Sequence, residues 1–294
     1  MPAFHAGRHE HGQNFLSDRT VIDHIVELVA RTDGPIVEIG SGAGALTIPL
    51  QRLRRPIEAV EIDARLARSL GRRADPAHTS VVCADFLHHR LPHTPHVIVG
   101  NLPFHQTTAI LRRLLRSPHW THAVLVTQWE VARRRAGVGG ATMMTAQWWP
   151  WYDFGLAGRV PATAFAPRPG VDGGLLTITR RTDPLLKTAR RGDYQGFVHA
   201  MFTGSGHGLG EIAGRAVPAD RRGEVRRWIS AHRLHSRLPR DLDATEWATL
   251  YRLGAPEITS VPSGPSRSST PRKRQARARR GSTGSVRQGG RRGS

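Results

Sequence analysis

The sequence predicts an α/β fold in which a mostly parallel sheet is followed by a small all-α region and a basic tail. Strand-like and helix-like apolar patterns alternate between residues 36 and 127, at lengths typical of β-α-β units. Residues 183–258 show helical periodicity only, and the chain beyond them has almost no apolar side chains. We therefore expect a flexible N-terminus at 1–12, an α/β domain at 13–182, a helical domain at 183–258 and a disordered tail at 259–294.

The α/β region begins with a helix. Ser17-Asp18 is a helix start signal, and apolar residues then recur at helical spacing as far as Arg31. The strands expected after it lie at 36–39, 57–62, 80–83, 97–99 and 123–127. The intervening helices are expected at 45–53, 64–73 and 107–116. Because parallel strands end at the same edge of a sheet, Glu38, Glu61, Asp85 and Asn101 should converge there.

The second half of the chain is read as a short basic helix, a closing strand pair and three further helices. A basic helix is expected at 131–135, strands at 152–156 and 175–179, an extended stretch at 165–169, and helices at 194–202, 224–232 and 244–253. Trp148, Trp149 and Trp151 favour core or domain packing over stacking on RNA, because Trp buries a large area. Asp243 and Glu246 match a capping box at the start of the last helix.

The charge balance indicates a polyanionic partner. The 294 residues carry a net charge of +20. Residues 261–294 hold ten Arg or Lys and no acid, which leaves +10 for residues 1–260. A genome that favours Arg over Lys is the alternative explanation, but such a bias exchanges cations and creates no net charge. Basic candidates for holding RNA are Arg112, Arg113 and Arg116 on one helix, and Arg133 to Arg135 on another.

The remaining composition indicates a cytoplasmic protein that has no membrane segment. Cys83 is the only cysteine, so no intrachain disulfide forms, and it should be a buried strand residue rather than a nucleophile. No apolar run has membrane-spanning length, and residues 1–10 lack the apolar core of a signal peptide.

A glycine loop follows the first strand. Gly40-Ser41-Gly42-Ala43-Gly44 lies between a strand and a helix, where glycines let the backbone approach a ligand. Glu61 ends the next strand, where an acid can bind ribose hydroxyls. These features do not separate a dinucleotide from S-adenosylmethionine, since the dinucleotide fingerprint also tolerates Ala45 in place of its third glycine. Asp85 either accepts a hydrogen bond from an adenine amine or caps the segment after it.

Asn101-Leu102-Pro103-Phe104 follows another buried strand and can grip a planar nitrogen base. The Asn101 amide oxygen and the Leu102 carbonyl can both accept hydrogen bonds from one exocyclic amine. Pro103 stiffens that carbonyl, and Phe104 offers a face for stacking. An ordinary Asn/Pro turn over a core Phe explains the same four residues.

Several segments together resemble the ribosomal RNA adenine dimethyltransferase family. They are Gly12-Gln13-Asn14-Phe15-Leu16, the segment from Glu38 to Gly44, Ala84-Asp85-Phe86-Leu87 and Asn101-Leu102-Pro103-Phe104. Segments 128–133, 145–150 and 167–172 resemble its Erm branch of actinomycete type, which confers resistance to macrolide, lincosamide and streptogramin B antibiotics. The resemblance covers roughly residues 11 to 255.

The resemblance implies a Rossmann-like class I S-adenosylmethionine-dependent methyltransferase domain and a small helical C-terminal domain. Its implied cofactor is S-adenosylmethionine, and no metal is expected. Asn14 and Gly40 would contact the methionine end, Glu61 the ribose and Asp85 the adenine, and Leu16, Ile62, Phe86 and Asn101 complete the expected cofactor site. Asn101 and Leu102 would bind the target N6, and Phe104 and Phe165 would sandwich the target base. The Phe104 position is often Tyr in the family, so a catalytic hydroxyl is not required there.

The implied activity is methylation of one adenine N6 in the peptidyl-transferase region, domain V, of 23S rRNA, by a monomer acting before ribosome assembly is complete. One or two methyl groups fit the sequence. The alternatives are a 16S rRNA adenine dimethyltransferase, against which the Trp-rich stretch argues, and a non-catalytic nucleic-acid-binding relative. A nicotinamide dehydrogenase would leave Asn101 to Phe104 unexplained.

Overall fold

The computed structural model describes residues 14–255 of the chain. The expected flexible N-terminus at 1–12 and disordered tail at 259–294 lie outside the described residues. The α/β part ends with a strand at Arg180, and every later described element is helical. One hydrophobic cluster nevertheless includes residues from both parts, such as Leu176 and Trp247. The division into two domains at 182/183 stays a prediction.

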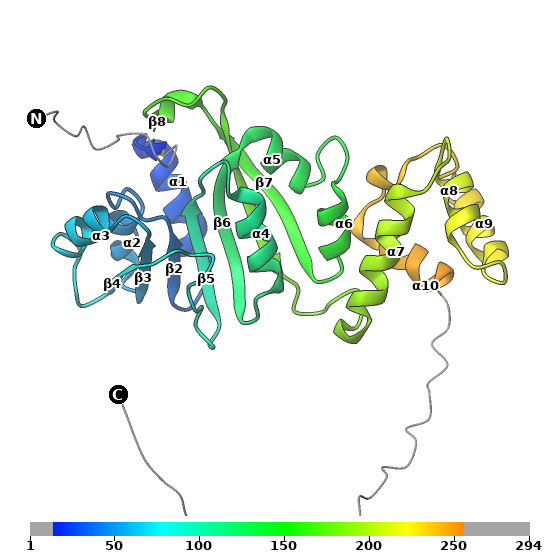
Figure 1. Cartoon of the computed structure of the whole chain (residues 1–294), viewed down its shortest axis with the longest axis horizontal. Coiled ribbons are helices and arrows are strands. Elements are labelled where there is room, and N and C mark those ends of the chain that lie inside the picture. The colour runs from blue at the N-terminus through cyan, green and yellow to red at the C-terminus, as the bar shows by residue number, and fades with distance from the viewer. Residues whose placement is uncertain (1–13, 256–294) are drawn as a thin grey trace, which may run out of the picture. The chain divides into compact units, whose positions relative to one another are not determined.

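The core is a seven-stranded sheet with the order β4-β3-β2-β5-β6-β9-β7 (Figure 1). Its strands are β2 (Ile36–Ile39), β3 (Ile57–Glu61), β4 (Thr79–Cys83), β5 (His96–Asn101), β6 (Trp120–Gln128), β7 (Tyr152–Val160) and β9 (Gly173–Arg180). The first five are parallel, and β9 runs antiparallel between β6 and β7. The chain leaves β2 toward β3 and later returns to its other side as β5. Ligands of open α/β sheets bind at such a switch point, beyond the carboxyl ends of the strands.

Helices cover both faces of this sheet. They are α1 (Arg19–Ala30), α2 (Thr47–Leu50), α3 (Ala64–Gly71), α4 (Thr107–Arg116) and α5 (Trp129–Arg135). Apolar residues of α1 and α2 pack with one face, and those of α4 and α5 pack with the other. Successive residues of β5 point to opposite faces of the sheet. Val97 and Val99 pack in the cluster that includes α1 and α2, and Ile98 packs in the cluster that includes α4 and α5.

A short two-stranded pairing adds to the α/β part. β1 (Phe15–Leu16) pairs antiparallel with β8 (Phe165–Ala166), with Phe15 opposite Ala166 and Leu16 opposite Phe165. Ser17 adds backbone and side-chain hydrogen bonds to the Ala164 carbonyl. The pairing therefore brings the Asn14 region, early in the chain, beside Phe165.

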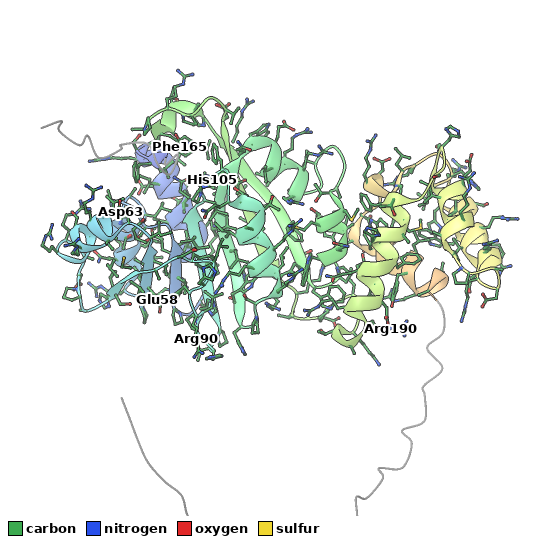
Figure 2. All side chains as sticks on the ribbon, viewed as in Figure 1. Glu58, Asp63, Arg90, His105, Phe165 and Arg190 are labelled. Atoms are coloured by element: carbon green, nitrogen blue, oxygen red, sulfur yellow. The ribbon has the colours of Figure 1, made fainter. Side chains whose placement is uncertain are left out.

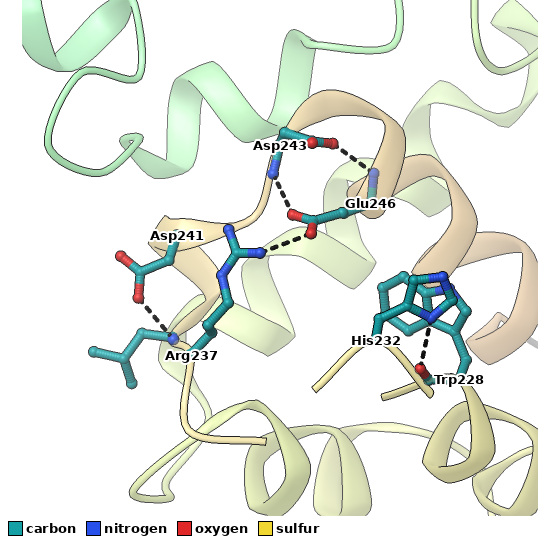
Figure 3. A network of polar contacts seen from close by, with 7 residues as sticks. Trp228, His232, Arg237, Asp241, Asp243 and Glu246 are labelled. Carbon is teal, nitrogen blue, oxygen red and sulfur yellow. Dashed lines mark hydrogen bonds and ion pairs between the residues drawn. The ribbon is translucent and has the colours of Figure 1, made fainter. Parts of the chain in front are cut away.

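Helices make up the part of the chain after β9. They are α7 (Arg191–Thr203), α8 (Leu209–Ala216), α9 (Arg222–Ala231) and α10 (Ala244–Gly254), and α6 (Met143–Trp148), which precedes β7, packs with them. Tyr194 on α7 is buried and donates from its hydroxyl to the Ala146 carbonyl on α6 at 2.8 Å. Figure 3 shows the capping box expected at α10, in which Asp243 and Glu246 each accept from the other's backbone N–H. Leu238 N–H and Asp241 make a similar closure in the turn before it.

Most expected elements are confirmed, and the differences have local causes. The helix expected at 45–53 is only the four residues of α2 followed by a 3-10 turn, since Pro49 has no N–H to donate. The strand pattern missed β1, because two residues give no periodicity. It also missed α6 and α8; Gly210 and Gly214 weaken the helical signal of α8. Trp148 and Trp151 are buried as expected.

The expectation that Cys83 is buried is wrong. Cys83 is exposed at the carboxyl end of β4. The reason lies in the topology: β4 is an edge strand of the sheet and pairs there only with β3. The apolar neighbours Val81 and Val82, which suggested burial, are themselves only half-buried.

Candidate active site

The carboxyl ends of the strands carry a cleft built around the loop that follows β2. Gly40, Gly42 and Gly44 all have positive φ, at 66°, 53° and 87°, which a residue with a side chain adopts only under strain. A Cβ at Gly42 would also lie 3.0 Å from the Phe15 ring. Three adjoining hollows of about 330, 110 and 70 Å³ open here, and Gly40 lines all of them.

Glu61 is fixed within this cleft. The residue is 2 % exposed, Oε2 accepts from Gly42 N at 2.7 Å and Oε1 accepts from Asp63 N at 2.9 Å. Two backbone N–H groups therefore orient the carboxylate, and each oxygen keeps a second lone pair for a ligand. Glu61 thus also stabilises the glycine loop, which the sequence pattern did not predict.

Glu38 is a site residue whose chemistry the sequence reasoning did not assign. It is 1 % exposed, lines the largest hollow of the cleft and accepts a hydrogen bond from Thr47 Oγ1 at 2.6 Å. Burial raises the pKa of Glu38 to about 8, the Thr47 hydrogen bond opposes that shift and the charge of Glu61 adds to it. A lone acid inside an apolar strand was the available signal, since such a group is costly to bury in its charged form.

Asn101 connects the cleft to the N-terminal segment. Its Nδ2 donates to the Asn14 carbonyl at 2.6 Å, across 87 residues of sequence. This bond decides the orientation of the amide and leaves Oδ1 as the acceptor end. The pairing of β1 with β8 holds the segment next to Asn14 in place for that contact.

The next three residues form the lip of the cleft. Leu102 N donates to the Val126 carbonyl at 3.0 Å, and Leu102 lines the 70 Å³ hollow although the residue as a whole is 1 % exposed. Phe104 is half-buried, while Phe165 is 3 % exposed. Their ring centroids are 6.4 Å apart and the rings are 77° from parallel. The expected sandwich is therefore not preformed, and a ring would have to turn for a base to enter between them.

The other sequence-predicted residues occupy the second side of the cleft. Ile62, half exposed, and Asp85 line the 110 Å³ hollow together with Phe86. Asp85 Oδ1 accepts from Leu87 N at 2.8 Å and Oδ2 lies 3.0 Å from His88 Nδ1, so the capping role is real and leaves lone pairs for a ligand. Leu16 is 4 % exposed and packs in the core, but it also lines the 330 Å³ hollow of the cleft.

One further side chain, His105, belongs to this edge of the sheet. Figure 2 shows Phe165, His105 and Asp63 toward the same edge, while Glu58 and Arg90 lie toward the opposite one. His105 lines the 110 Å³ hollow but was absent from the predicted site. Its position directly after Phe104, in the segment predicted to hold the base, was the available signal.

The structure gives one member of each predicted RNA-binding helix another role. Arg113 donates to the Leu87 and His89 carbonyls and stacks over Phe86 with 5.4 Å to the ring centroid. It supports the Asp85 segment instead of facing solvent. Arg133 pairs with Glu130 at 2.9 Å. Arg112, Arg116 and Arg134 are exposed and stay candidates.

The described residues show neither a metal-binding group nor a membrane span. Within 14–255, no three or more His, Cys, Asp or Glu side chains gather so as to hold a metal ion. No helix in the same range is both long and apolar enough to cross a bilayer.

Comparison with known proteins decides the family. The ribosomal RNA adenine dimethylase family matches residues 4–227, about three quarters of the chain. The chain belongs to this family. The matched residues include the whole sheet and every residue of the cleft described above.

Relatives within the family are similar over most of their length. An rRNA adenine N-6-methyltransferase of Corynebacterium diphtheriae is 57% identical over 215 residues, 73% of this chain and 85% of that protein. The mycinamicin-resistance protein MyrB of Micromonospora griseorubida is 46% identical over 95% of this chain and 86% of its own. A ribosomal RNA small subunit methyltransferase A of Streptomyces griseus is 34% identical over 66% of this chain and 71% of its own. The crystal structure of the 23S rRNA methyltransferase ErmE superimposes with a TM-score of 0.75 at 33% identity, over 82% of this chain and 99% of that one.

Proposed function

We propose that the chain transfers a methyl group from S-adenosylmethionine to N6 of one adenine in domain V of 23S rRNA, and so gives resistance to macrolide, lincosamide and streptogramin B antibiotics. The observation that carries this proposal is the hydrogen bond from Asn101 Nδ2 to the Asn14 carbonyl. It leaves Oδ1 free next to the Leu102 carbonyl in the chain, so that two acceptors can serve one amine at the lip of a glycine-lined cleft.

The cleft fits S-adenosylmethionine. Glycine at position 40 leaves room for close approach, since a Cβ there would find only the Asn101 carbonyl, at 3.9 Å. Glu61 would hold the ribose hydroxyls, Asp85 and the exposed Ile62 the adenine, and Asn14 and Gly40 the methionine end. Bound there, the cofactor supplies a methyl group on positively charged sulfur. Glu38, neutral at pH 7 because its pKa is raised to about 8, adds no negative charge beside Glu61.

The chain's own contribution at the target is to present the amine. The N6 lone pair of adenine is delocalised into its ring, which makes it a poor nucleophile. Hydrogen bonds from its N–H groups to Asn101 Oδ1 and the Leu102 carbonyl favour a more pyramidal and more nucleophilic nitrogen. Holding both reactants in position can contribute about 7–11 kcal/mol.

The base must leave its stack to reach these acceptors, which costs a few kcal/mol. Stacking on the Phe104 ring can return about 1–3 kcal/mol. The product nitrogen loses its proton readily once methylated, so a dedicated general base is unnecessary. This agrees with Phe at position 104, which has no hydroxyl.

The comparisons support 23S over 16S rRNA as the substrate. The 23S rRNA methyltransferase ErmE superimposes with a TM-score of 0.75 over 99% of its chain, and the resistance protein MyrB is 46% identical, against 34% for a small subunit methyltransferase. The complete set of Gly40, Glu61, Asp85 and Asn101 argues against a non-catalytic binder. We further propose that the protein acts in the cytoplasm, as a monomer, on rRNA whose assembly is incomplete.

Two measurements test the proposal. Primer extension on both rRNAs, isolated from cells that express the chain, should give one new stop in domain V of 23S rRNA and none in 16S rRNA where two methyl groups are added, because a dimethylated N6 has no N–H left for base pairing. Mass spectrometry of the digested nucleosides should show N6-methyladenosine or its dimethyl form, made on naked 23S rRNA and not on finished subunits. A new stop confined to 16S rRNA would support the alternative, and no binding of S-adenosylmethionine by calorimetry would favour the binder.

A further inference from the structure

A second region of the molecule, apart from the cofactor cleft, also contains a hollow. It measures about 720 Å³ and lies where α5, α6 and the loop between them meet the end of α7 and the turn before α10. It shares no residue with the three hollows of the cleft. Its volume is within the range of small-molecule sites.

Three arginines line this hollow, and few carboxylates balance them. Arg134 and Arg240 are exposed, and Arg135 is half-buried. The lining carboxylate Glu130 pairs with Arg133, and Asp241 lies 3.8 Å from Arg240 while also accepting from Leu238 N. The group is thus a net positive wall.

Of the three arginines, Arg135 gives the strongest indication that an anion binds here. Its Nη1 donates to Thr142 Oγ1 at 2.5 Å, but its Nε is buried and has no hydrogen-bond partner among the described residues. Burial lowers the pKa of Arg135, and the charges of Arg112 and Arg134 lower it further, with no acid acting in the other direction. A partly desolvated cation among like charges is unfavourable unless an anion joins it.

The hollow also has an apolar wall. Met143, Met201, Phe202, Ile212 and Leu238 line it. Several hydrogen bonds hold the turn that carries Leu238 and Arg240. Ala141 N donates to the Arg240 carbonyl at 2.7 Å. Figure 3 shows that Leu238 N donates to Asp241 and that Arg237 pairs with Glu246. An apolar wall combined with a cationic one suits a flat ring that carries a phosphate.

We propose that this hollow binds one unstacked nucleotide of the RNA substrate, its base against the apolar wall and its phosphate facing Arg134, Arg135 and Arg240. The inference rests on the proposed function, since it takes RNA as the substrate. Single-stranded or bulged nucleotides are the parts of RNA that proteins read by stacking and by contact with base edges. A second nucleotide held away from the target adenine would let the enzyme select an RNA shape.

The first test removes the two exposed cations. Arg134→Gln with Arg240→Gln should weaken binding of a domain V RNA fragment about ten-fold at about 0.1 M salt and lower the slope of log Kd against log salt by about 1–2. Arg226→Gln with Arg227→Gln, on the exposed face of α9, removes the same charge and should change the affinity by less than about three-fold. Equal losses for both double variants would overturn the proposal, because they would indicate general attraction only.

The second test reads the hollow directly. Cys83 is the chain's only cysteine, so Cys83→Ser with Met143→Cys places a single thiol in the apolar wall. The RNA fragment should slow alkylation of this introduced thiol by N-ethylmaleimide at least about five-fold more than S-adenosylmethionine does, because a bound base covers the wall. The control variant, Cys83→Ser with Ala77→Cys, has its thiol at an exposed position just before β4 and should gain no protection.

The outcomes separate this inference from the proposed function. Methylation of the fragment by the Met143→Cys variant before alkylation shows that the function holds, whatever happens at the hollow. Protection of the introduced thiol by millimolar AMP without protection by RNA would overturn the assignment to the RNA substrate and indicate a free nucleotide. Absence of protection by either would overturn the site itself.

Discussion

Asn101 derives its expected role from a single asymmetric contact. A free amide could present either end to a ligand, and oxygen and nitrogen exchange places by a simple flip. The bond from Nδ2 to the Asn14 carbonyl removes that freedom. Oδ1 is left as the acceptor end because the pairing of β1 with β8 positions the segment that carries Asn14.

Replacing Asn101 by Ala should remove one of the two acceptors for the target amine. We expect turnover to fall by about 100-fold or more, while the Kd for S-adenosylmethionine changes by less than about three-fold, since the pairing of β1 with β8 still holds the Asn14 segment and the other expected cofactor contacts remain. Single-turnover methylation and calorimetry measure the two quantities. Unchanged turnover would remove the central role given to Asn101, and equal thermal melts would show that the variant is folded.

Glu38 should make stability depend on pH in a direction opposite to that of an ion-paired acid. Its folded pKa of about 8 lies above the ordinary 4.5, so the folded state holds a proton that the unfolded state releases between those values. The stabilisation is complete below the unfolded pKa of 4.5 and is lost as pH rises to about 8, at up to about 1.4 kcal/mol per pH unit.

Glu38→Gln keeps the shape and the acceptor for Thr47 but cannot ionise. The difference in unfolding free energy between this variant and the natural chain should therefore grow in favour of the variant from about pH 5 to about pH 8 and then level off. Urea titrations at several pH values measure it. A difference that is flat over this range would show that Glu38 is charged when buried.

Among the helices and strands, short strand pairings and helix caps fix the positions of the segments that line the two sites. β1 and β8 have only two residues each, yet they bring the Asn14 segment to the cleft. Asp241 and the capping box close the turn before α10, and this turn lines the 720 Å³ hollow. These elements have few residues, and each depends on particular side chains.

The cap of α10 should have a measurable share in stability. Asp243→Ala removes the acceptor for Glu246 N and should cost about 1 kcal/mol, or about 2–4 °C in Tm. Asp243→Asn retains an acceptor oxygen and should lose much less. A thermal melt compares the three proteins, and identical losses for Ala and Asn would mean that charge, and not the cap, is what counts.

Over the full length of the chain, charge is divided between a basic body and a more basic C-terminal segment. Residues 261–294 lie outside the described residues, but their ten cations and lack of acids are plain in the sequence. Contacts between such cations and RNA phosphates would add affinity and salt dependence but would carry no sequence information.

Deleting residues 261–294 should weaken RNA binding and flatten its salt dependence, with each lost phosphate contact reducing the slope of log Kd against log salt by about 0.7–0.9. The methylated adenine should stay the same, because the pocket proposed to hold it lies within residues 14–255. Primer extension identifies the adenine and binding at several salt concentrations gives the slope. A truncated enzyme that methylates a different adenine would contradict this division of roles.

Local patterns along the chain were enough to predict the α/β class, the glycine loop, the acids at the strand ends and the family. A periodicity or a motif fits within a few residues, and the carboxyl ends of parallel strands must share an edge. The net charge is likewise a property of the sequence, because it does not depend on folding.

Roles that depend on partners distant in the chain needed the folded structure. Arg113 supports the Asp85 segment, Cys83 is exposed on an edge strand, one end of the Asn101 amide is committed, and the Phe104 and Phe165 rings stand at an angle. Arg135 and Arg240, from distant parts of the chain, line one hollow. The physical reason is that burial and hydrogen bonding are set by whichever groups the fold brings together, and no short stretch of sequence contains both partners.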